Sequence, residues 1–308
     1  MSERYQQKAS QAEETRRVWV WADAHIGLSG PQNDNRDGWE WLESAIIDVR
    51  DHLLPLDFVL SLGDLTNKGT DEQLAKYAEV RSRAGFAKWY EMAGNHDYWA
   101  FLRGSWQKHA SLPQHAVLVD GNVVWILSSV ELDGASGRIS QKTFDWLKKT
   151  IDLHRDKNVI VCTHQPLYDT VTNSKKEWRS VFVWKDDGHP YEIGRVTEDQ
   201  LRAVERMLDE VRVDLWLCSH AHSGPRDPNW CVRRGRTTIL NVASICHAYG
   251  TQASRSFLFE LENGSNILKA RNRHHEKSCF APEFSLDLQL PFPWKRPQTN
   301  DWVVQRGE

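Results

Sequence analysis

The chain has 308 residues, of which 40% are hydrophobic and 26% are charged, as in a globular protein with a proper core. Its formal net charge of −3, without a long lysine or arginine run, does not favour a nucleic-acid substrate, because DNA-binding proteins usually carry a basic surface. No segment reaches the roughly 18 uninterrupted apolar residues of a membrane span. Residues 1–17 lack the apolar core of a signal peptide. We therefore expect a cytoplasmic protein that does not contact a membrane.

Short apolar runs alternate with amphipathic stretches after a polar tail at residues 1–16. Several of the apolar runs are continuous, as in β-strands that are covered on both faces. The amphipathic stretches begin at capping residues and predict helices. In chain order we expect strands at 18–21, 57–62, 89–93, 123–128, 159–163, 215–218 and 238–242, and helices at 39–54, at 70–83, from 140 and from 197. This alternation predicts an α/β fold.

A long polar insert interrupts this alternation at residues 168–196. Loops of this length often act as lids or binding elements, so the insert is a candidate lid over a binding cleft. Its aromatic side chains are the natural candidates to touch a substrate. They are Trp178, Trp184 and Tyr191.

The last part of the chain, residues 270–308, mixes histidine, proline and aromatic residues without clear periodicity. We expect this extension to pack against the domain or against a second subunit, which leaves a homo-oligomer as an open alternative. His274 and His275 are expected on the surface of this tail.

Residues that commonly bind metal ions follow five of the predicted strands directly. Functional groups in α/β sheets gather beyond the carboxyl ends of the strands, so these side chains are expected to converge on one place. In chain order they are Asp23, His25, Asp64, Asn95, His164, His220 and His222.

The residue types point to a pair of divalent metal ions. Mixed carboxylate, imidazole and amide donors suit Mn, Fe, Zn or Ni, and a bridging carboxylate can hold two ions for phosphate-ester hydrolysis. The spacings Asp-x-His and His-x-His place both side chains on one side of an extended segment. Gly63 and Gly94 allow the backbone to turn tightly beside the ligands.

The ordered series Asp23-Ala-His25, Gly63-Asp64, Gly94-Asn-His-Asp97, His164 and His220-Ala-His222 resembles the calcineurin-like metallophosphoesterases, whose pattern is D-x-H, G-D, G-N-H-D/E, H and G-H-x-H. The match extends over about residues 18–222, with Ser219 where the family usually has glycine. The resemblance implies one α/β domain at residues 17–269, folded as a four-layer αββα sandwich with two mixed β-sheets.

The resemblance also implies a role for each site residue. One ion is assigned to Asp23, His25 and His222, and the second to Asn95, His164 and His220, with Asp64 as the bridge. Asn95 and His96 contact the substrate phosphate, His96 helps to protonate the leaving alkoxide, and Asp97 orients His96. The implied nucleophile is a hydroxide that bridges the two ions.

Three further segments are similar to the bacterial class III cyclic-nucleotide phosphodiesterase branch. They are residues 129–141 leading into Trp146-Leu147, Gly63–Gly69 and Thr163–Pro166. The leading hypothesis is therefore hydrolysis of a small phosphodiester, with a cyclic nucleotide as one option.

Three alternatives stay open. Asp23-Ala-His25-Ile-Gly27 also resembles DNA exonucleases of the repair type, although the charge of the chain does not support that reading. A phosphomonoesterase is the second alternative, while the arginine-bearing motifs of Ser/Thr protein phosphatases are missing near Lys68 and Asp97. A non-catalytic scaffold is the third, against which stands the complete set of ligands, because buried charged groups are costly without a metal.

Overall fold

The computed structural model describes most of the chain. The described residues are 14–86, 88–110, 115–129, 137–171, 182–184, 198–222, 229–247, 253–297 and 303–306, with the backbone alone at 182–184, 199 and 303–306. Within these ranges, no helix combines the length and the apolar character that crossing a membrane requires. Most of the candidate lid at 168–196, including the side chains of its three aromatic candidates, lies outside the described residues.

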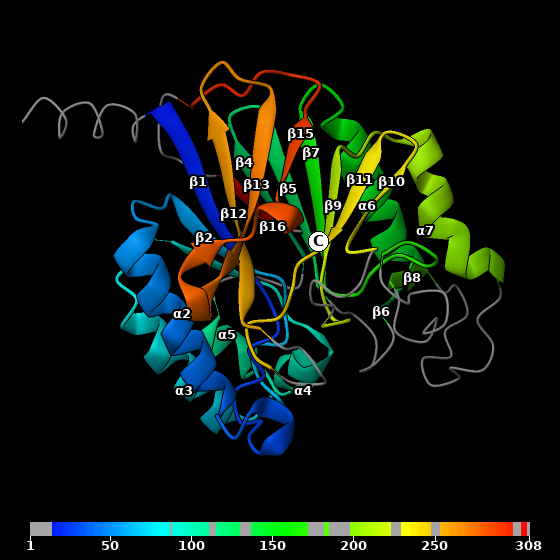
Figure 1. Cartoon of the computed structure of the whole chain (residues 1–308). Helices are drawn as coiled ribbons and strands as arrows, with labels where there is room; N and C mark the ends of the chain where they lie inside the picture. Colours follow the sequence, from blue (N-terminus) through cyan, green and yellow to red (C-terminus); the bar gives the residue numbers. More distant parts are fainter. Residues whose placement is uncertain are drawn as a thin grey trace, which may run out of the picture.

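The first sheet joins strands from the two ends of the chain (Figure 1). Its order is β14-β13-β12-β1-β2-β3, and β15 pairs with β13. β1, β2 and β3 are parallel, whereas β12 runs antiparallel to β1. The strands are β1 Thr15–Trp21, β2 Phe58–Ser61, β3 Trp89–Glu91, β12 Arg255–Glu262, β13 Ile267–His274, β14 Cys279–Phe280 and β15 Leu286–Gln289.

The second sheet has the order β10-β11-β9-β7-β5-β4-β16. β5, β7, β9 and β11 are parallel in its centre, while β10, β4 and β16 are antiparallel to their neighbours. These strands are β4 His115–Asp120, β5 Val123–Ser128, β7 Asn158–Thr163, β9 Leu215–Cys218, β10 Cys231–Arg234, β11 Thr237–Asn241 and β16 Val303–Arg306. A separate pair is formed by β6 Gly137–Ile139 and β8 Phe182–Trp184.

Two helices begin at the capping residues that the sequence predicts, whereas Thr197, expected to begin a fourth helix, lies outside the described residues. Thr70 and Ser140 are the N-cap residues of α3 and α6, and each side chain accepts a hydrogen bond from the backbone N–H three residues later. Asp37 and Glu40 form a capping box at the start of α2. The helices are α2 Gly38–His52, α3 Asp71–Ser82, α4 Tyr98–Leu102, α5 Trp106–His109, α6 Gln141–Leu153 and α7 Glu198–Glu210.

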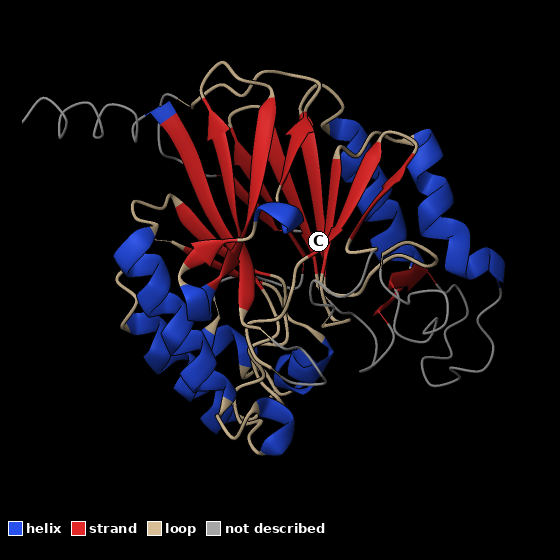
Figure 2. Cartoon of the chain, in the orientation of Figure 1, coloured by secondary structure: helices blue, strands red, loops and turns tan. Residues whose placement is uncertain are grey.

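Alternation along the strands produces the four layers. In β1, Val18 and Val20 face the second sheet, whereas Trp19 and Trp21 pack under the helices on the other side. α2 and α3 cover the outer face of the first sheet, and α6 and α7 cover the outer face of the second (Figures 1 and 2). The predicted αββα sandwich with two mixed sheets is confirmed.

The C-terminal part of the chain adds strands to both sheets. β14 and β15 pair with β13, and β16 pairs with β4. The surface position expected for His274 and His275 is wrong, because both side chains are buried. His275 contacts Asp48 of α2, and a run of residues without periodicity could not reveal this long-range partner.

Candidate metal centre

The ligand candidates lie in five loops that follow β1, β2, β3, β7 and β9. Backbone hydrogen bonds join these loops to one another: Asp23 N donates to Gly63 O at 3.0 Å, His25 N to Asp64 O at 3.0 Å, and Ser219 N to His164 O at 2.8 Å. Because β1, β2 and β3 belong to the first sheet and β7 and β9 to the second, both sheets contribute side chains to the site.

Five of the seven ligand candidates adopt a left-handed backbone conformation. Their φ angles are 56° at Asp23, 49° at His25, 51° at Asp64, 66° at His220 and 46° at His222. This conformation is uncommon outside glycine and persists where the surrounding structure enforces it, often at functional sites. Hydrogen bonds between the loops hold the backbone of Asp23, His25 and Asp64 in place, and all five left-handed residues belong to the two ligand groups.

Asp23, His25, Asp64 and His222 form the first group of side chains, whose ligand atoms lie within 4.8 Å of one another. The Nε2 atoms of His25 and His222 are 3.0 Å apart. His222 Nε2 lies 3.5 Å from Asp23 Oδ1, and His25 Nε2 lies 3.6 Å from Asp64 Oδ2. All four side chains are buried, and their oxygen and nitrogen atoms converge as the ligands of one ion do.

Asp64, His164 and His220 form the second group, which also lies within 4.8 Å. Asp64 Oδ2 is 3.1 Å from His164 Nε2, and Asn95 Oδ1 is 3.1 Å from the same nitrogen. His96 N donates a hydrogen bond of 2.9 Å to the other oxygen of Asp64. Asp64 thus belongs to both groups, which is the position that a bridging carboxylate needs.

Gly63 and Gly94 make the close approach of these loops possible. A Cβ atom on Gly63, whose φ is 107°, would lie 2.6 Å from Gly94 N and 2.7 Å from His164 Nδ1. A Cβ atom on Gly94 would lie 2.1 Å from Asp64 Oδ1. Any larger residue at either position would displace the ligands.

Burial sets the protonation of the cluster. It raises the pKa of Asp23 to about 8, an effect to which the neighbouring charge of Asp64 adds. Burial lowers the pKa of His220 to about 3 and also lowers that of His25. His164 differs: burial lowers its pKa, but the charges of Asp64 and Asp23 together with the hydrogen bonds to Asp64 and Leu62 O outweigh burial and raise the pKa to about 9. Burial also acts on Asp64, but the neighbouring charges of His164 and His25 and the hydrogen bond from His164 hold its pKa well below the ordinary value. The protons that an added cation would replace are therefore those of Asp23 and His164.

The donor atoms also fit a metal on hydrogen-bonding grounds. Both carboxylate oxygens of Asp23, Oδ2 of Asp64 and Nδ1 of His220 are buried and make no hydrogen bond of normal geometry with the described residues. Buried carboxylate oxygens without partners are costly, and a divalent cation removes that cost. The residues present therefore suit two divalent ions, although the donor set is compatible with several metals.

A family model described as calcineurin-like phosphoesterase matches residues 16–224, which is more than half of the chain and includes all seven ligand candidates. The chain belongs to this family. The family and the cluster of ligands together indicate a dinuclear metal centre.

Two curated relatives share about a quarter of their aligned residues with this calcineurin-like phosphoesterase. A protein of Arcobacter nitrofigilis named probable glycerophosphodiester phosphodiesterase GpdQ is 25% identical over 151 residues, covering 47% of this chain and 55% of that protein. Human tartrate-resistant acid phosphatase type 5 is 26% identical over 211 residues, covering 56% of this chain and 57% of that protein. The chain thus spans about half the length of these relatives.

The fold is also similar to that of purple acid phosphatase PPD1 from yellow lupin. The two structures superpose with a TM-score of 0.58 at 15% sequence identity, over 89% of this chain and 54% of the plant protein. At this identity the likeness concerns the fold alone, and it agrees with the two mixed sheets described above.

One expected contact of the phosphoesterase site needs correction. Asp97 was expected to orient His96, but its carboxylate accepts hydrogen bonds from the backbone N–H groups of Leu65, Thr66 and Gly94 at 2.9–3.1 Å. The atom beside His96 Nδ1 is instead the carbonyl oxygen of Asn67, at 2.7 Å. Asp97 therefore holds the loops after β2 and β3 together, and a backbone carbonyl orients His96.

Two more side chains support the ligands and were not expected to do so. The hydroxyl of Ser219 lies 3.0 Å from His164 Nδ1, which also contacts Leu62 O at 2.8 Å. Gln165 Nε2 lies 3.5 Å from Asn95 Oδ1. The sequence signal for Ser219 was that it replaces the glycine usual in the family. The sequence signal for Gln165 was its position directly after His164.

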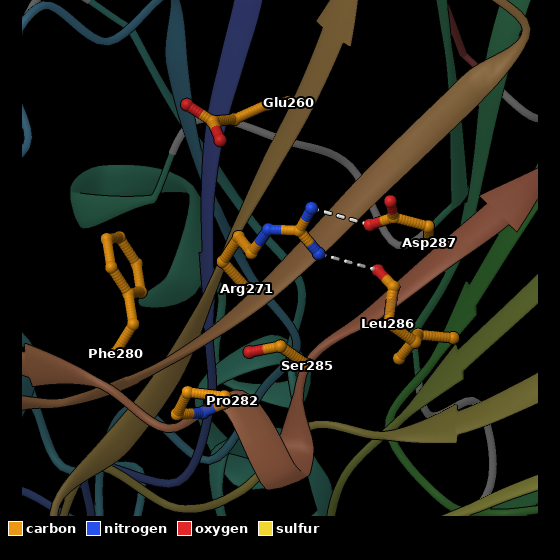
Figure 3. Close-up of a pocket in the computed structure, with 7 residues that line it drawn as sticks. All are labelled: Glu260, Arg271, Phe280, Pro282, Ser285, Leu286 and Asp287. Atoms are coloured by element: carbon orange, nitrogen blue, oxygen red, sulfur yellow. Dashed lines mark hydrogen bonds and ion pairs between the residues drawn. The ribbon is translucent and has the colours of Figure 1, made fainter.

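A surface pocket of about 520 Å³ lies away from the ligands, on β12, β13 and the segment that follows them (Figure 3). Its central Arg271 forms an ion pair with Asp287 and donates a hydrogen bond to Leu286 O. None of the seven ligand candidates lines this pocket. The positive charge of Arg271 is thus already compensated by Asp287, so the pocket does not compete with the metal centre as the functional site.

Proposed function

We propose that this protein is a metal-dependent phosphoester hydrolase that cleaves phosphodiesters, a cyclic nucleotide being one option. The observation that carries the proposal is the convergence of two ligand groups that share Asp64. The membership of the chain in the calcineurin-like phosphoesterase family supports it. The name of the Arcobacter relative, a probable phosphodiesterase, favours a diester substrate.

The residues that would hold the two ions correspond to the two ligand groups of the structure. Asp23, His25 and His222 would bind the first ion, Asn95, His164 and His220 the second, and Asp64 both. When bound, two divalent ions supply Lewis acids that neutralise the charge of the phosphate and lower the pKa of an attacking water.

The chain itself positions and protonates the leaving group through His96. Its Nδ1 atom is held by the carbonyl oxygen of Asn67, so this nitrogen carries the hydrogen and Nε2 remains the atom that exchanges a proton. The ring lies edge-on to the ring of His25, with centroids 4.7 Å apart, and is therefore beside the first ligand group. In this role His96 is a general acid for the departing alkoxide, and Asn95 helps to bind the phosphate.

A phosphomonoesterase is the second candidate function. The human relative is named an acid phosphatase, and its alignment covers more of this chain than that of the phosphodiesterase. The metal-binding residues serve either reaction, so the substrate preference distinguishes the two functions.

The test compares substrates on protein stripped with a chelator and reloaded with Mn, Zn, Ni or Fe. Bis(p-nitrophenyl) phosphate, p-nitrophenyl phosphate and cyclic AMP are assayed side by side, and bound metal is quantified by plasma emission. Metal-stimulated cleavage of the diesters is the expected result, and cleavage of cyclic AMP would narrow the substrate. Preference for the monoester would favour the phosphatase. Absence of both metal and cleavage would contradict the proposal and favour a scaffold.

A further inference from the structure

Helix α4 exposes two large apolar side chains immediately beyond the metal centre. It starts at Tyr98, directly after the short helical turn Asn95–Asp97 that carries the ligand Asn95 and the proposed acid His96. Trp99 is 54% exposed and Leu102 is 60% exposed. A five-residue helix thus holds two of the few strongly exposed large hydrophobic residues in the described part of the chain. Such exposure is unfavourable in water, and it commonly marks a binding site.

Helical spacing places these side chains in line with the site. Asp97 and Ala100 are fully buried and fix the inner side of the helical segment. The outer side of the segment lies opposite Asp97 and Ala100. Trp99 follows His96 by three residues, so it lies on the outer side, about one helical turn beyond His96. Leu102 follows Trp99 by another three residues and continues the line. The result is an apolar strip that begins beside His96 and leads away from the metal ligands.

The packing of α4 holds the strip in a fixed orientation. Phe101 stacks on Trp106 with ring centroids 4.8 Å apart, and a Cβ atom on Gly69 would lie 3.1 Å from Ala100 N. The ring of Tyr98 meets the ring of Trp99 edge-on at 5.8 Å. These contacts anchor the helix on its inner side, so the exposure of Trp99 comes from its direction and not from a loosely attached helix.

The size of the strip argues against a protein partner. A stable interface uses about 20–30 residues on each side, whereas this strip consists of two large side chains beside a polar site. It has the dimensions of a subsite for one ring. The flat indole face of Trp99 suits a planar aromatic group through stacking, and Leu102 extends the apolar surface.

We propose that Trp99 and Leu102 form an apolar subsite that binds an aromatic ring esterified to the substrate phosphate, such as an aryl group or a nucleobase-bearing alcohol. This inference rests on the proposed function and specifies its substrate class. Trp99 is then a residue that determines specificity: it binds the part of the substrate that does not react, while His96 and the metal ligands act on the phosphate.

The test uses two diesters of which only the first carries an aromatic ring, methyl phenyl phosphate and methyl trifluoroethyl phosphate, with the released alcohol followed by NMR. With metal-loaded protein, Trp99→Ala should raise the KM for the phenyl diester by about 5- to 10-fold, the size of one aromatic contact, with kcat unchanged. The KM for methyl trifluoroethyl phosphate should be unaffected, and Trp99→Phe should restore most of the affinity for the phenyl diester. Leu153→Ala is the matched control, because Leu153 is 67% exposed on α6 and should change neither KM.

Equal effects of Trp99→Ala on the two diesters, or no effect on either, would overturn the subsite. The same would follow if light scattering showed a dimer that Trp99→Ala dissociates without a change in KM, because the strip would then join two copies of the chain. Failure of the proposed function is recognised separately, since the wild-type protein would cleave neither diester. Calorimetric titration with phenyl phosphate and methyl phosphate then decides the subsite: a preference for phenyl phosphate that Trp99→Ala abolishes supports it, and equal binding refutes it.

Discussion

Two buried carboxylate clusters on the first sheet differ in where their compensating charge comes from. In the metal centre, Asp23 and Oδ2 of Asp64 make no hydrogen bond of normal geometry with the described residues. On the outer face of the same sheet, Asp48 receives Arg273 Nη2 at 2.6 Å and Arg273 Nε at 2.8 Å, and His275 Nδ1 lies 2.8 Å away. Asp48 is neutralised by Arg273, whereas in the metal centre Asp64 has His164 Nε2 at 3.1 Å and Asp23 lacks a hydrogen-bonding cation among the described residues.

The second cluster continues into the core as a structural connection. His275 Nε2 lies 2.7 Å from the hydroxyl of Ser256, which also accepts a hydrogen bond of 2.7 Å from Trp19 Nε1. The order Asp48, His275, Ser256 has the residue types of a hydrolytic triad. Ser256 is fully buried and already bonded, so it has no access to a substrate. The network ties α2 to β12 and β13 instead.

The pKa values follow the same division. Burial acts on both carboxylates, but the hydrogen bonds from Arg273 and His275 hold the pKa of Asp48 well below its ordinary value. Burial raises the pKa of Asp23 to about 8 because its surroundings supply too little positive charge. The comparison teaches that burial alone does not identify a functional carboxylate. A buried carboxylate that lacks a hydrogen-bonding partner within the chain is the better indication of a functional site.

The largest effect is expected from Asp64→Ala. The variant should lose both ions and at least about 1,000-fold in activity, because Asp64 belongs to both ligand groups. The free energy of unfolding of the chelated protein should fall by about 1–3 kcal/mol, since the hydrogen bond from His96 N and the ion pair with His164 Nε2 are lost. Plasma emission, the diester assay and urea unfolding measure these quantities. Full metal content in the variant would contradict the bridging position.

Asp48→Ala should mainly reduce the stability of the protein and leave its metal content unchanged. It leaves Arg273 buried without its partner, so the free energy of unfolding should fall by about 3–5 kcal/mol, while folded protein keeps its metal. Asp51→Ala on the same helix is the control, because Asp51 is exposed and pairs only with exposed Arg50. Asp51→Ala should change the free energy of unfolding by no more than about 0.5 kcal/mol. If Asp48→Ala and Asp51→Ala lowered the free energy of unfolding equally, the buried network would not contribute to stability as proposed.

Acid should destabilise the chelated protein partly through His275. Burial lowers the pKa of this histidine in the folded state, so below pH 6.5 the unfolded chain takes up a proton that the folded chain refuses. The free energy of unfolding then falls as the pH falls, by at most about 1.4 kcal/mol per pH unit for one proton. His25 and His220 act with the same sign, and Asp48 adds a loss below about pH 4.

The variant His275→Gln measures how much of the acid destabilisation is due to His275. Urea unfolding between pH 7 and pH 5 should give a flatter dependence for the variant than for the wild type, although the variant is less stable at neutral pH. Identical slopes would show that His275 accepts its proton without unfolding and that the other histidines account for the acid sensitivity.

The smallest effect is expected from Ser219→Gly, which restores the family residue. The hydroxyl of Ser219 contacts His164 Nδ1, but the carbonyl of Leu62 contacts the same atom at a shorter distance. Metal affinity, measured by competition with a chelator, should therefore fall by no more than about 10-fold. A loss of more than 100-fold would mean that Ser219, and not Leu62, orients His164.

Much of the fold could be predicted from the sequence because its central strands are continuous apolar runs. β5 and β9 were predicted with their observed bounds. β13 was not predicted, since Lys269, Arg271 and Arg273 alternate with its core residues and resemble a charged tail. Arg273 pairs with Asp48 on α2, far away in the chain, so local pattern could not show that the segment is a strand.

The candidate ligand positions were visible in the sequence because each follows a strand directly. The roles of Asp97 and Asn67 were not, since both depend on how the loops after β2 and β3 meet. Asn67 acts through its backbone carbonyl, which leaves no trace in the residue type. The outward direction of Trp99 required the phase of α4 relative to the core, which only the three-dimensional packing determines.

Each ligand group takes side chains from both sheets, and this has a consequence for the order of assembly. Asp23, His25 and Asp64 come from the first sheet, whereas His164, His220 and His222 come from the second. Neither group is complete until the two sheets have docked. A complete metal site would therefore form only after the two sheets have docked, and ions bound there would link the two halves of the sandwich to each other.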